Sequence, residues 1–298
     1  MYAKFFLCVL LNVFLSSCSK EKKSNSDMTE PTLTADSFFV KGADMSWLTE
    51  MEAAGINFYS TTGVQTEPMA LVKSYGINTI RLRVWVNPTN GWNGTADVVS
   101  KALRAKSLGL HILIDFHYSD AWADPGKQTK PAAWASLDFI GLKAAVAAHT
   151  KDVLSQLKTA GVKPEWVQVG NETNDGKLWP DGKASSNISN YAQLISEGYD
   201  AIKNVFLAAK VMVHLSNGWD NALYRWNING LISNGAKFDM IGMSLYPQFV
   251  ASGWAIANQQ CFANMNDIVS RYKKEVMIVE AGMPGMMLKL AKHFLKIS

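Results

Sequence analysis

Cysteine and clustered basic residues are scarce in the sequence, and each scarcity argues against a class of protein. Only 3 of the 298 residues are cysteine, too few for a disulfide-dense miniprotein, and no Cys/His spacing is typical of a zinc site. The 29 lysines and arginines are scattered along the chain, without a basic block interleaved with aromatic residues. We therefore expect no bound metal or other cofactor and no nucleic-acid partner.

The composition is that of a protein with a large buried core. Hydrophobic residues make up 48% of the chain and aromatic residues 11%, which excludes an intrinsically disordered or collagen-like protein. A chain of this length can bury one large α/β domain or two small ones.

The first residues predict an export signal. Lys4 gives a positive start, and Phe5 to Leu15 form an apolar run interrupted only by Asn12. This run is too short to span a bilayer comfortably, and small residues follow it, so residues 1–17 are predicted to be a signal peptide.

The end of this signal resembles a bacterial lipobox, Leu15-Ser16-Ser17-Cys18, in which the cysteine is acylated and becomes the mature N-terminus. The alternative is ordinary cleavage near Ser17. The polar residues 18–37 predict a flexible tether. We therefore expect an exported protein that Cys18 anchors to the bacterial cell envelope, at the outer membrane or the cell surface.

From residue 38 onward, short β-rich runs alternate with longer helical stretches. The runs are nearly continuous in apolar and β-branched residues, which is typical of parallel strands buried on both faces. They span Phe38 to Ser46, Thr79 to Val86, His111 to Ser119, Trp166 to Glu172, Lys210 to Asn217, Asp239 to Pro247 and Val276 to Gly282. The helical stretches between them include Thr66 to Tyr75, Thr95 to Leu108, Leu137 to Ala160 and Ile188 to Phe206, with Gly76, Gly109 and Gly161 as expected C-caps.

Polar residues at the ends of these strands favour an α/β fold of the (β/α)₈ TIM-barrel type. In such barrels the functional residues gather at the carboxyl ends of the strands. Here those positions hold Asp44, Arg81, Arg83, His117, Asn171, Glu172, Asn217, Tyr246 and Glu280. A doubly wound nucleotide-binding fold would need a glycine-rich phosphate turn after its first strand, and the sequence from Gly42 to Trp47 has none.

Two strand-end glutamates carry the candidate chemistry. Glu172 ends the fourth strand and Glu280 ends the seventh, so both are expected at the mouth of the barrel. Hydrolysis of a glycoside needs one protonated and one ionised carboxyl group, and different surroundings can separate their pKa values. The alternative is that each glutamate caps a helix or pairs with a surface lysine. Two such residues on these strands, with aromatic residues around them, favour catalysis.

Several motifs give the chain a resemblance to a known family. Asn171-Glu172 and Glu280 resemble the strand-end pattern of the large superfamily of retaining glycosidases built on this barrel. Five further stretches resemble glycoside hydrolase family 53, the endo-β-1,4-galactanases: KGADMS from Lys41, RLRVWVNP from Arg81, DFHYSD with WADPG from Asp115, VGNE with LWPDG from Val169, and SLYP from Ser244. The resemblance covers residues 38–284.

The resemblance implies an endo-acting retaining hydrolase that cleaves β-1,4-galactan, such as the side chains of pectic arabinogalactan, by double displacement. Glu172 would be the general acid/base and Glu280 the nucleophile, about 5 to 5.5 Å apart. Asn171 would bind the 2-hydroxyl of the sugar, and Arg81 would hydrogen-bond Glu280 and keep it ionised. Tyr246 and His117 would complete the pocket.

Other assignments leave alternatives open. One of Arg81 and Arg83 could only bridge a core carboxylate, and the superfamily position favours Arg81 as the catalytic neighbour. His117 could equally be a structural histidine, whereas His111 and His214 are expected to be scaffold. Trp85 is a candidate for stacking on a sugar, although about half of the strand-end tryptophans are expected to be packing only. Asp181 could contact sugar hydroxyls, although Asp-Gly is first a turn signal.

The C-terminal residues depart from the family pattern. The chain ends 18 residues after Glu280, and residues 285–298 form a lysine-rich tail without a strand pattern. We therefore expect the barrel over residues 38–284 to lack its eighth unit, as after premature termination, and the chain to be poorly stable and weakly active. No heptad pattern predicts an oligomer, so a monomer is expected. Two alternative functions remain, a lipid-anchored galactan-binding protein without turnover and a cellulase or mannanase of the same superfamily.

Overall fold

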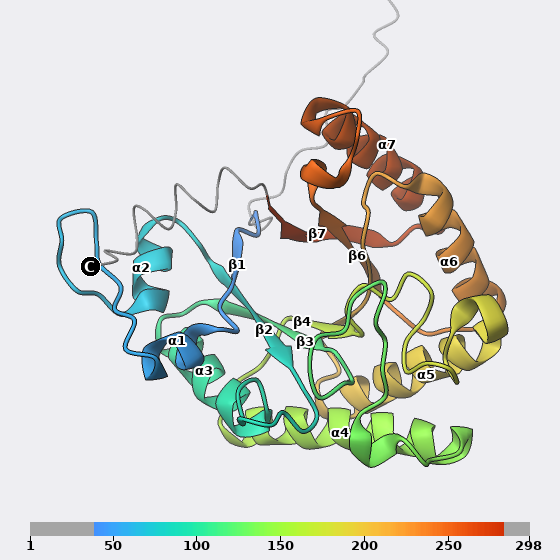
Figure 1. Ribbon diagram of the computed structural model, residues 1–298, viewed down its shortest axis with the longest axis horizontal. Coiled ribbons are helices and arrows are strands. Elements are labelled where there is room, and N and C mark those ends of the chain that lie inside the picture. Colours follow the sequence, from blue (N-terminus) through green and yellow to red (C-terminus); the bar gives the residue numbers. More distant parts are fainter. Residues whose placement is uncertain (1–38, 283–298) are drawn as a thin grey trace, which may run out of the picture. The chain divides into compact units, whose positions relative to one another are not determined.

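The β-rich runs form seven parallel strands, each paired with the next in chain order (Figure 1). These strands belong to residues 39–282, the part of the chain that the computed structural model describes. They are β1 (Gly42–Asp44), β2 (Thr79–Val84), β3 (His111–Phe116), β4 (Trp166–Val169), β5 (Lys210–Leu215), β6 (Met240–Leu245) and β7 (Glu275–Ala281). The sheet curves into a nearly closed barrel, which confirms the predicted fold class.

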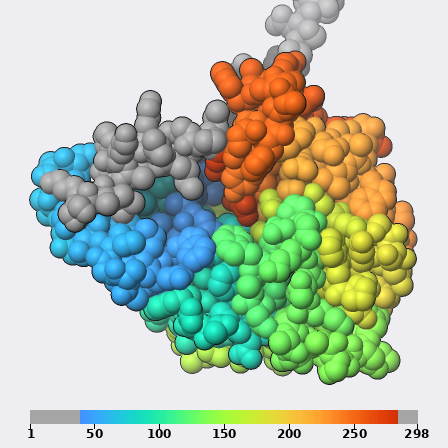
Figure 2. Space-filling model, in the orientation of Figure 1, coloured from blue at the N-terminus to red at the C-terminus, as the bar shows by residue number. Residues whose placement is uncertain are grey.

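Helices connect the strands and cover the outer face of the sheet (Figure 1). Parallel strands need a long crossover connection, which the helices provide. The residues of β2 to β6 are nearly all buried, whereas β1 and β7, at the two edges of the sheet, keep exposed residues. The helices are α1 (Leu48–Ala53), α2 (Pro68–Ser74), α3 (Thr95–Ser107), α4 (Phe139–Thr159), α5 (Ala184–Val205), α6 (Asn221–Ser233) and α7 (Trp254–Tyr272), with 3-10 turns η1 (Ala132–Trp134) and η2 (Pro247–Phe249). The space-filling view in the same orientation shows successive segments, from teal through green and yellow to orange, packed side by side (Figure 2).

All seven predicted strands are present, and each ends one to three residues earlier than predicted. The fourth, for example, ends at Val169 rather than Glu172. The apolar pattern continues past the hydrogen-bonded ladder into the loops, where buried side chains line the mouth of the barrel. The predicted C-caps Gly76, Gly109 and Gly161 all have positive φ, at 89°, 67° and 71°.

Alternation along the strands divides the core into two parts. Residues such as Ile112, Ile114 and Phe116 face the helices and join the main hydrophobic cluster. Inward-facing residues near the amino ends of the strands, including Leu113 and Met212, form a second apolar cluster. On the inner face of the strands, the positions two residues nearer to the carboxyl ends are polar. The candidate site is formed by these polar side chains.

Four predictions concern residues outside the described part of the chain. They are the signal peptide at residues 1–17, the acylation of Cys18, the tether at residues 18–37 and the tail at residues 285–298. Within residues 39–282 none of the helices has the length and apolar character needed to span a membrane.

Candidate active site

Arg81 of β2 is the centre of a charged cluster at the carboxyl ends of the strands. Its guanidinium contacts Asp44 of β1 and Asp115 of β3 at 2.8 Å each, and Glu280 of β7 at 2.7 Å. Its Nε donates to Gln168 of β4 at 2.9 Å. Burial alone would lower the pKa of Arg81, but the three carboxylates outweigh it and raise this pKa. The guanidinium therefore stays charged.

Both carboxylate oxygens of Glu280 have a donor. Oε1 pairs with Arg81, and Oε2 accepts a 2.8 Å hydrogen bond from the hydroxyl of Tyr246, which follows β6. Burial, followed by the charge of Glu280, raises the pKa of Tyr246, so the phenol keeps the proton that it donates. Two donors thus hold this carboxylate in one orientation.

Glu172 has quite different surroundings. Burial is the main cause that raises its pKa to about 7, and the negative charge of Glu280 adds to it. The hydroxyl of Ser244, on β6, donates to its Oε1 at 2.6 Å. A carboxyl group with this pKa can carry a proton at neutral pH.

The turn after β4 aims Glu172 into the site. Gly170 has φ 110°, and Glu172 itself has φ 46°, a left-handed conformation that is costly for a residue with a side chain. A Cβ added at Gly170 would lie 2.5 Å from Cγ2 of Thr173, so the turn has no room for a larger residue there. Local strain of this kind is typical of functional sites.

Asn171 is held between Arg81 and the loop that follows β3. Its Oδ1 accepts from Arg81 at 2.9 Å, and its Nδ2 donates to the carbonyl of Ala123 at 2.8 Å. These two bonds fix which end of the amide faces the guanidinium.

His117 links the charged cluster to the aromatic residues. Its Nε2 lies 2.9 Å from Oδ2 of Asp115, while its Nδ1 accepts from the backbone N–H of Ala123 at 3.1 Å and from the indole of Trp85 at 3.4 Å. With Nδ1 accepting, the ring proton is on Nε2 and faces Asp115.

Arg83 does not join the carboxylates but lies among three tryptophans. Its guanidinium carbon is 4.7, 4.8 and 4.0 Å from the ring centroids of Trp47, Trp85 and Trp122. Trp85 is only 9% exposed, whereas Trp122 is 43% exposed and leaves part of its ring free. Of the two arginines on this strand, it is Arg81 that contacts Glu280.

Asp181 lies outside this network. Its carboxylate pairs with Lys130 at 2.9 Å, and its backbone carbonyl accepts from Asn190. The structure therefore brings Glu172, Glu280, Asn171, Arg81, Tyr246, His117 and Trp85 into one connected cluster, and joins Asp181 to a neighbouring loop instead.

Four polar members of the cluster were not among the site residues predicted from the sequence: Asp115, Gln168, His214 and Ser244. Asp115 is a buried acid within the apolar strand run HILIDF, and that pattern is the signal that could have identified it. His214, expected to be scaffold, contacts Asn171 and Ser244. His214 and Ser244 come together only through the pairing of β5 with β6, which local sequence does not reveal.

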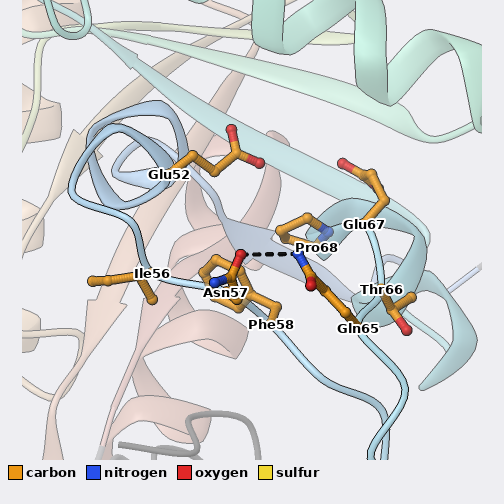
Figure 3. Close-up of a pocket in the computed structure, with 8 residues that line it drawn as sticks. All are labelled: Glu52, Ile56, Asn57, Phe58, Gln65, Thr66, Glu67 and Pro68. Carbon is orange, nitrogen blue, oxygen red and sulfur yellow. Dashed lines mark hydrogen bonds between the residues drawn. The ribbon is translucent and has the colours of Figure 1, made fainter. Parts of the chain in front are cut away.

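A pocket of about 480 Å³ lies elsewhere, between the end of α1 and the start of α2 (Figure 3). Glu52 and Glu67 line it, and both pair with Arg104 of α3. It contains none of the residues of the charged cluster. Within residues 39–282, no group of three His, Cys, Asp or Glu side chains is placed to hold a metal ion.

The arrangement supplies two carboxyl groups with different surroundings. Glu280 receives hydrogen bonds from a permanent cation and a phenol, whereas the pKa of Glu172 is raised towards neutrality. A carboxylate oriented by two donors beside a carboxyl group that can donate a proton is the pair that cleavage of a glycosidic bond requires.

Comparison with known proteins gives matches over most of the chain. The profile of glycosyl hydrolase family 53 matches residues 40–290. An arabinogalactan endo-β-1,4-galactanase of Thermothelomyces thermophilus is 37% identical over 250 residues, which are 82% of this chain and 74% of the relative.

Two solved structures are similar in fold and sequence. A fungal β-1,4-galactanase superimposes with a TM-score of 0.78 at 35% identity, over 83% of this chain and 75% of its own. The family 53 catalytic domain of Ignisphaera aggregans gives 0.77 at 35% identity, over 84% and 69%.

Proposed function

Because the chain belongs to glycosyl hydrolase family 53, a family of glycosidases, we propose that it is an endo-acting β-1,4-galactanase that retains anomeric configuration. The substrate follows from the relatives, which are named as galactanases. The substrate class would be galactan chains such as the side branches of pectic arabinogalactan.

The observation that carries the mechanism is the contrast between Glu172 and Glu280. Glu280 accepts from Arg81 and Tyr246 and is proposed as the nucleophile. Glu172, whose pKa is raised to about 7, is proposed as the general acid and base. The two carboxyl groups should lie about 5 to 5.5 Å apart, as retaining enzymes require.

In the first step, Glu172 gives its proton to the glycosidic oxygen while an oxygen of Glu280 attacks the anomeric carbon. The bond to the leaving sugar breaks, and a galactosyl ester forms on Glu280. In the second step, ionised Glu172 takes a proton from water, the water oxygen attacks the anomeric carbon, and Glu280 leaves as carboxylate. Glu172 is then protonated again, ready for the next cycle.

The neighbouring residues position these groups. Asn171, fixed by Arg81 and Ala123, would bind the 2-hydroxyl of the sugar that is cleaved. His117 would hold Asp115 beside Arg81 and could meet the sugar, and Trp85 would act through its hydrogen bond to His117. Asp181, in its ion pair with Lys130, would contact more distant sugar hydroxyls.

We also propose that the protein is exported and held at the cell envelope by a lipid on Cys18, as a monomer. The lipobox-like sequence before Cys18 supports the anchor. Incorporation of labelled palmitate into the parent, and its loss in Cys18→Ser, would test it.

A substrate panel tests the activity. The full chain should release reducing ends from β-1,4-galactan, with much slower release from mannan and cellulose. Release from cellulose or mannan alone would assign a different substrate. If the parent binds galactan without hydrolysing it, and Glu172→Ala and Glu280→Ala bind it equally well, the protein is a glycan-binding protein instead.

A further inference from the structure

A hydrogen-bond chain runs from β5 through β6 to the proposed acid/base. The ring Nε2 of His214 lies 2.9 Å from Oγ of Ser244, and that hydroxyl donates to Oε1 of Glu172 at 2.6 Å. The side chains of His214 and Ser244 are fully buried, so water does not compete for these contacts. The mechanism above uses neither residue.

The other side of the imidazole fixes its proton. Nδ1 of His214 accepts from the backbone N–H of Glu172 at 3.3 Å and lies 3.1 Å from Oδ1 of Asn171. A backbone N–H can only donate, so the bond from Glu172 requires an unprotonated Nδ1 on His214. Burial lowers the pKa of His214 to about 4, so the neutral ring carries one proton, and we place it on Nε2, facing Ser244.

This tautomer decides where the serine proton points. With Nε2–H donating to Oγ of Ser244, the hydroxyl proton cannot turn towards the histidine and is directed at Oε1 of Glu172. The carbonyl oxygen of a neutral carboxyl group is its better acceptor, so this bond favours the carboxyl proton on the other oxygen.

We propose that His214 and Ser244 are a pair of positioning residues that keep Oε1 of Glu172 as an acceptor, so that its transferable proton is carried on Oε2. In the first step that proton leaves Oε2 for the glycosidic oxygen, and no proton passes through Ser244 or His214. In the second step the same serine bond stabilises the carboxylate that receives a proton from water. The inference rests on the proposed role of Glu172.

Several charged or titratable groups face this pair from the other elements, and they set the background for any pH dependence. Those coupled to Glu172 or His214 are Asp124 after β3, Arg81 of β2, Asp115 of β3, His117 after β3, Tyr224 of α6, Tyr246 after β6 and Glu280 of β7. Variants of Ser244 and His214 leave all of these groups in place. A change in the titration of Glu172 in such a variant therefore reflects the loss or reorientation of the Ser244 hydroxyl.

The test compares Ser244→Ala with Ser244→Thr, which keeps a hydroxyl. The pH dependence of kcat/KM on galactan is measured together with the titration of ¹³C-labelled Glu172 by NMR. Because the serine bond favours the ionised carboxylate, its loss in Ser244→Ala should move the pKa of Glu172 and the alkaline limb of activity up by about one pH unit. Ser244→Thr should return both towards the parent.

A second pair of variants tests the histidine. His214→Gln keeps an N–H that can reach Ser244, whereas His214→Phe does not. His214→Phe should shift the titration in the same direction as Ser244→Ala, and adding it to Ser244→Ala should cause no further shift. His214→Gln should stay close to the parent.

Two results would overturn the inference. One is a folded Ser244→Ala variant in which the pKa of Glu172 is unchanged. The other is a double variant in which the pKa shifts of Ser244→Ala and His214→Phe add in full. A general loss of folding would lower the melting temperature and kcat without moving the titration. If the parent does not hydrolyse galactan, the proposed function fails, while the NMR titration of Glu172 still decides the inference.

Discussion

At the scale of the residue, the two carboxyl groups differ because their neighbours differ. Glu280 accepts from a cation and a phenol, whereas Glu172 is buried and faces the charge of Glu280. The sequence predicted that both lie at strand ends, but not which donors each would meet. Arg81 and Arg83 share a strand face, and only the folded barrel separates them, one among carboxylates and the other among tryptophans.

Replacing Glu172 by Gln should remove activity and change the pH dependence of stability. Its native pKa of about 7 is above the unfolded value near 4.5, so the stability of the parent falls as pH rises between these values. Glu172→Gln cannot ionise, and should therefore be more stable than the parent at pH 8 by up to about 3 kcal/mol, with little difference at pH 4. The activity should fall by at least about 100-fold.

Thermal unfolding from pH 4 to pH 9 measures this difference. Glu275→Gln is the matched control, because it removes one carboxylate from an exposed position on β7. If the difference in melting temperature between Glu172→Gln and the parent does not change with pH, the pKa of Glu172 is not raised by burial in the folded protein.

At the scale of the element, the turn after β4 carries Glu172, the proposed acid/base, from the end of a buried strand into the site. Gly170 at φ 110° lets the chain reverse so that Asn171 and Glu172 enter the mouth of the barrel. The strands, most of the helices and the glycine C-caps were predictable because apolar periodicity and glycine placement are local. The conformation of Glu172 was not predictable, since it belongs to a turn in which Thr173 and Lys177 leave no room for a side chain at position 170, and these contacts form only in the folded barrel.

Gly170→Ala should therefore reduce both stability and activity. The added Cβ would meet Thr173 at 2.5 Å in a backbone conformation that alanine disfavours, at a cost of about 1 kcal/mol or more. Because the turn carries Glu172, kcat should fall as well. Urea unfolding and kcat on galactan measure the two effects.

Gly235→Ala is the control for backbone strain alone. Gly235, after α6, also has positive φ, at 70°, but a Cβ added there would meet no atom within 4 Å. It should lose stability and keep kcat. Equal losses of kcat in the two variants would show that the turn at Gly170 does not position Glu172.

At the scale of the whole molecule, every strand contributes one side chain to a single connected network. Asp44, Asp115, Gln168 and Glu280 bind Arg81 from β1, β3, β4 and β7 around β2. His214 and Ser244 add β5 and β6 through Asn171 and Glu172.

The network explains how far the sequence could predict the site. Convergence at one end of the barrel was predictable, because parallel strands share their carboxyl ends. The individual contacts depend on register, such as the pairing of Arg81 with Leu113 that places Asp115 within reach, and register is a property of the assembled sheet.

The central claim is that Glu280 forms the covalent intermediate and Glu172 supplies the proton. Trapping with a 2-deoxy-2-fluoro galactobioside that carries a good leaving group tests it most directly, because the fluorine slows hydrolysis of the glycosyl ester. Peptide mapping by mass spectrometry should find one fluoroglycosyl group per chain, attached to Glu280. A label on Glu172 or on any other residue, or galactan hydrolysis without any trapped label, would contradict the account.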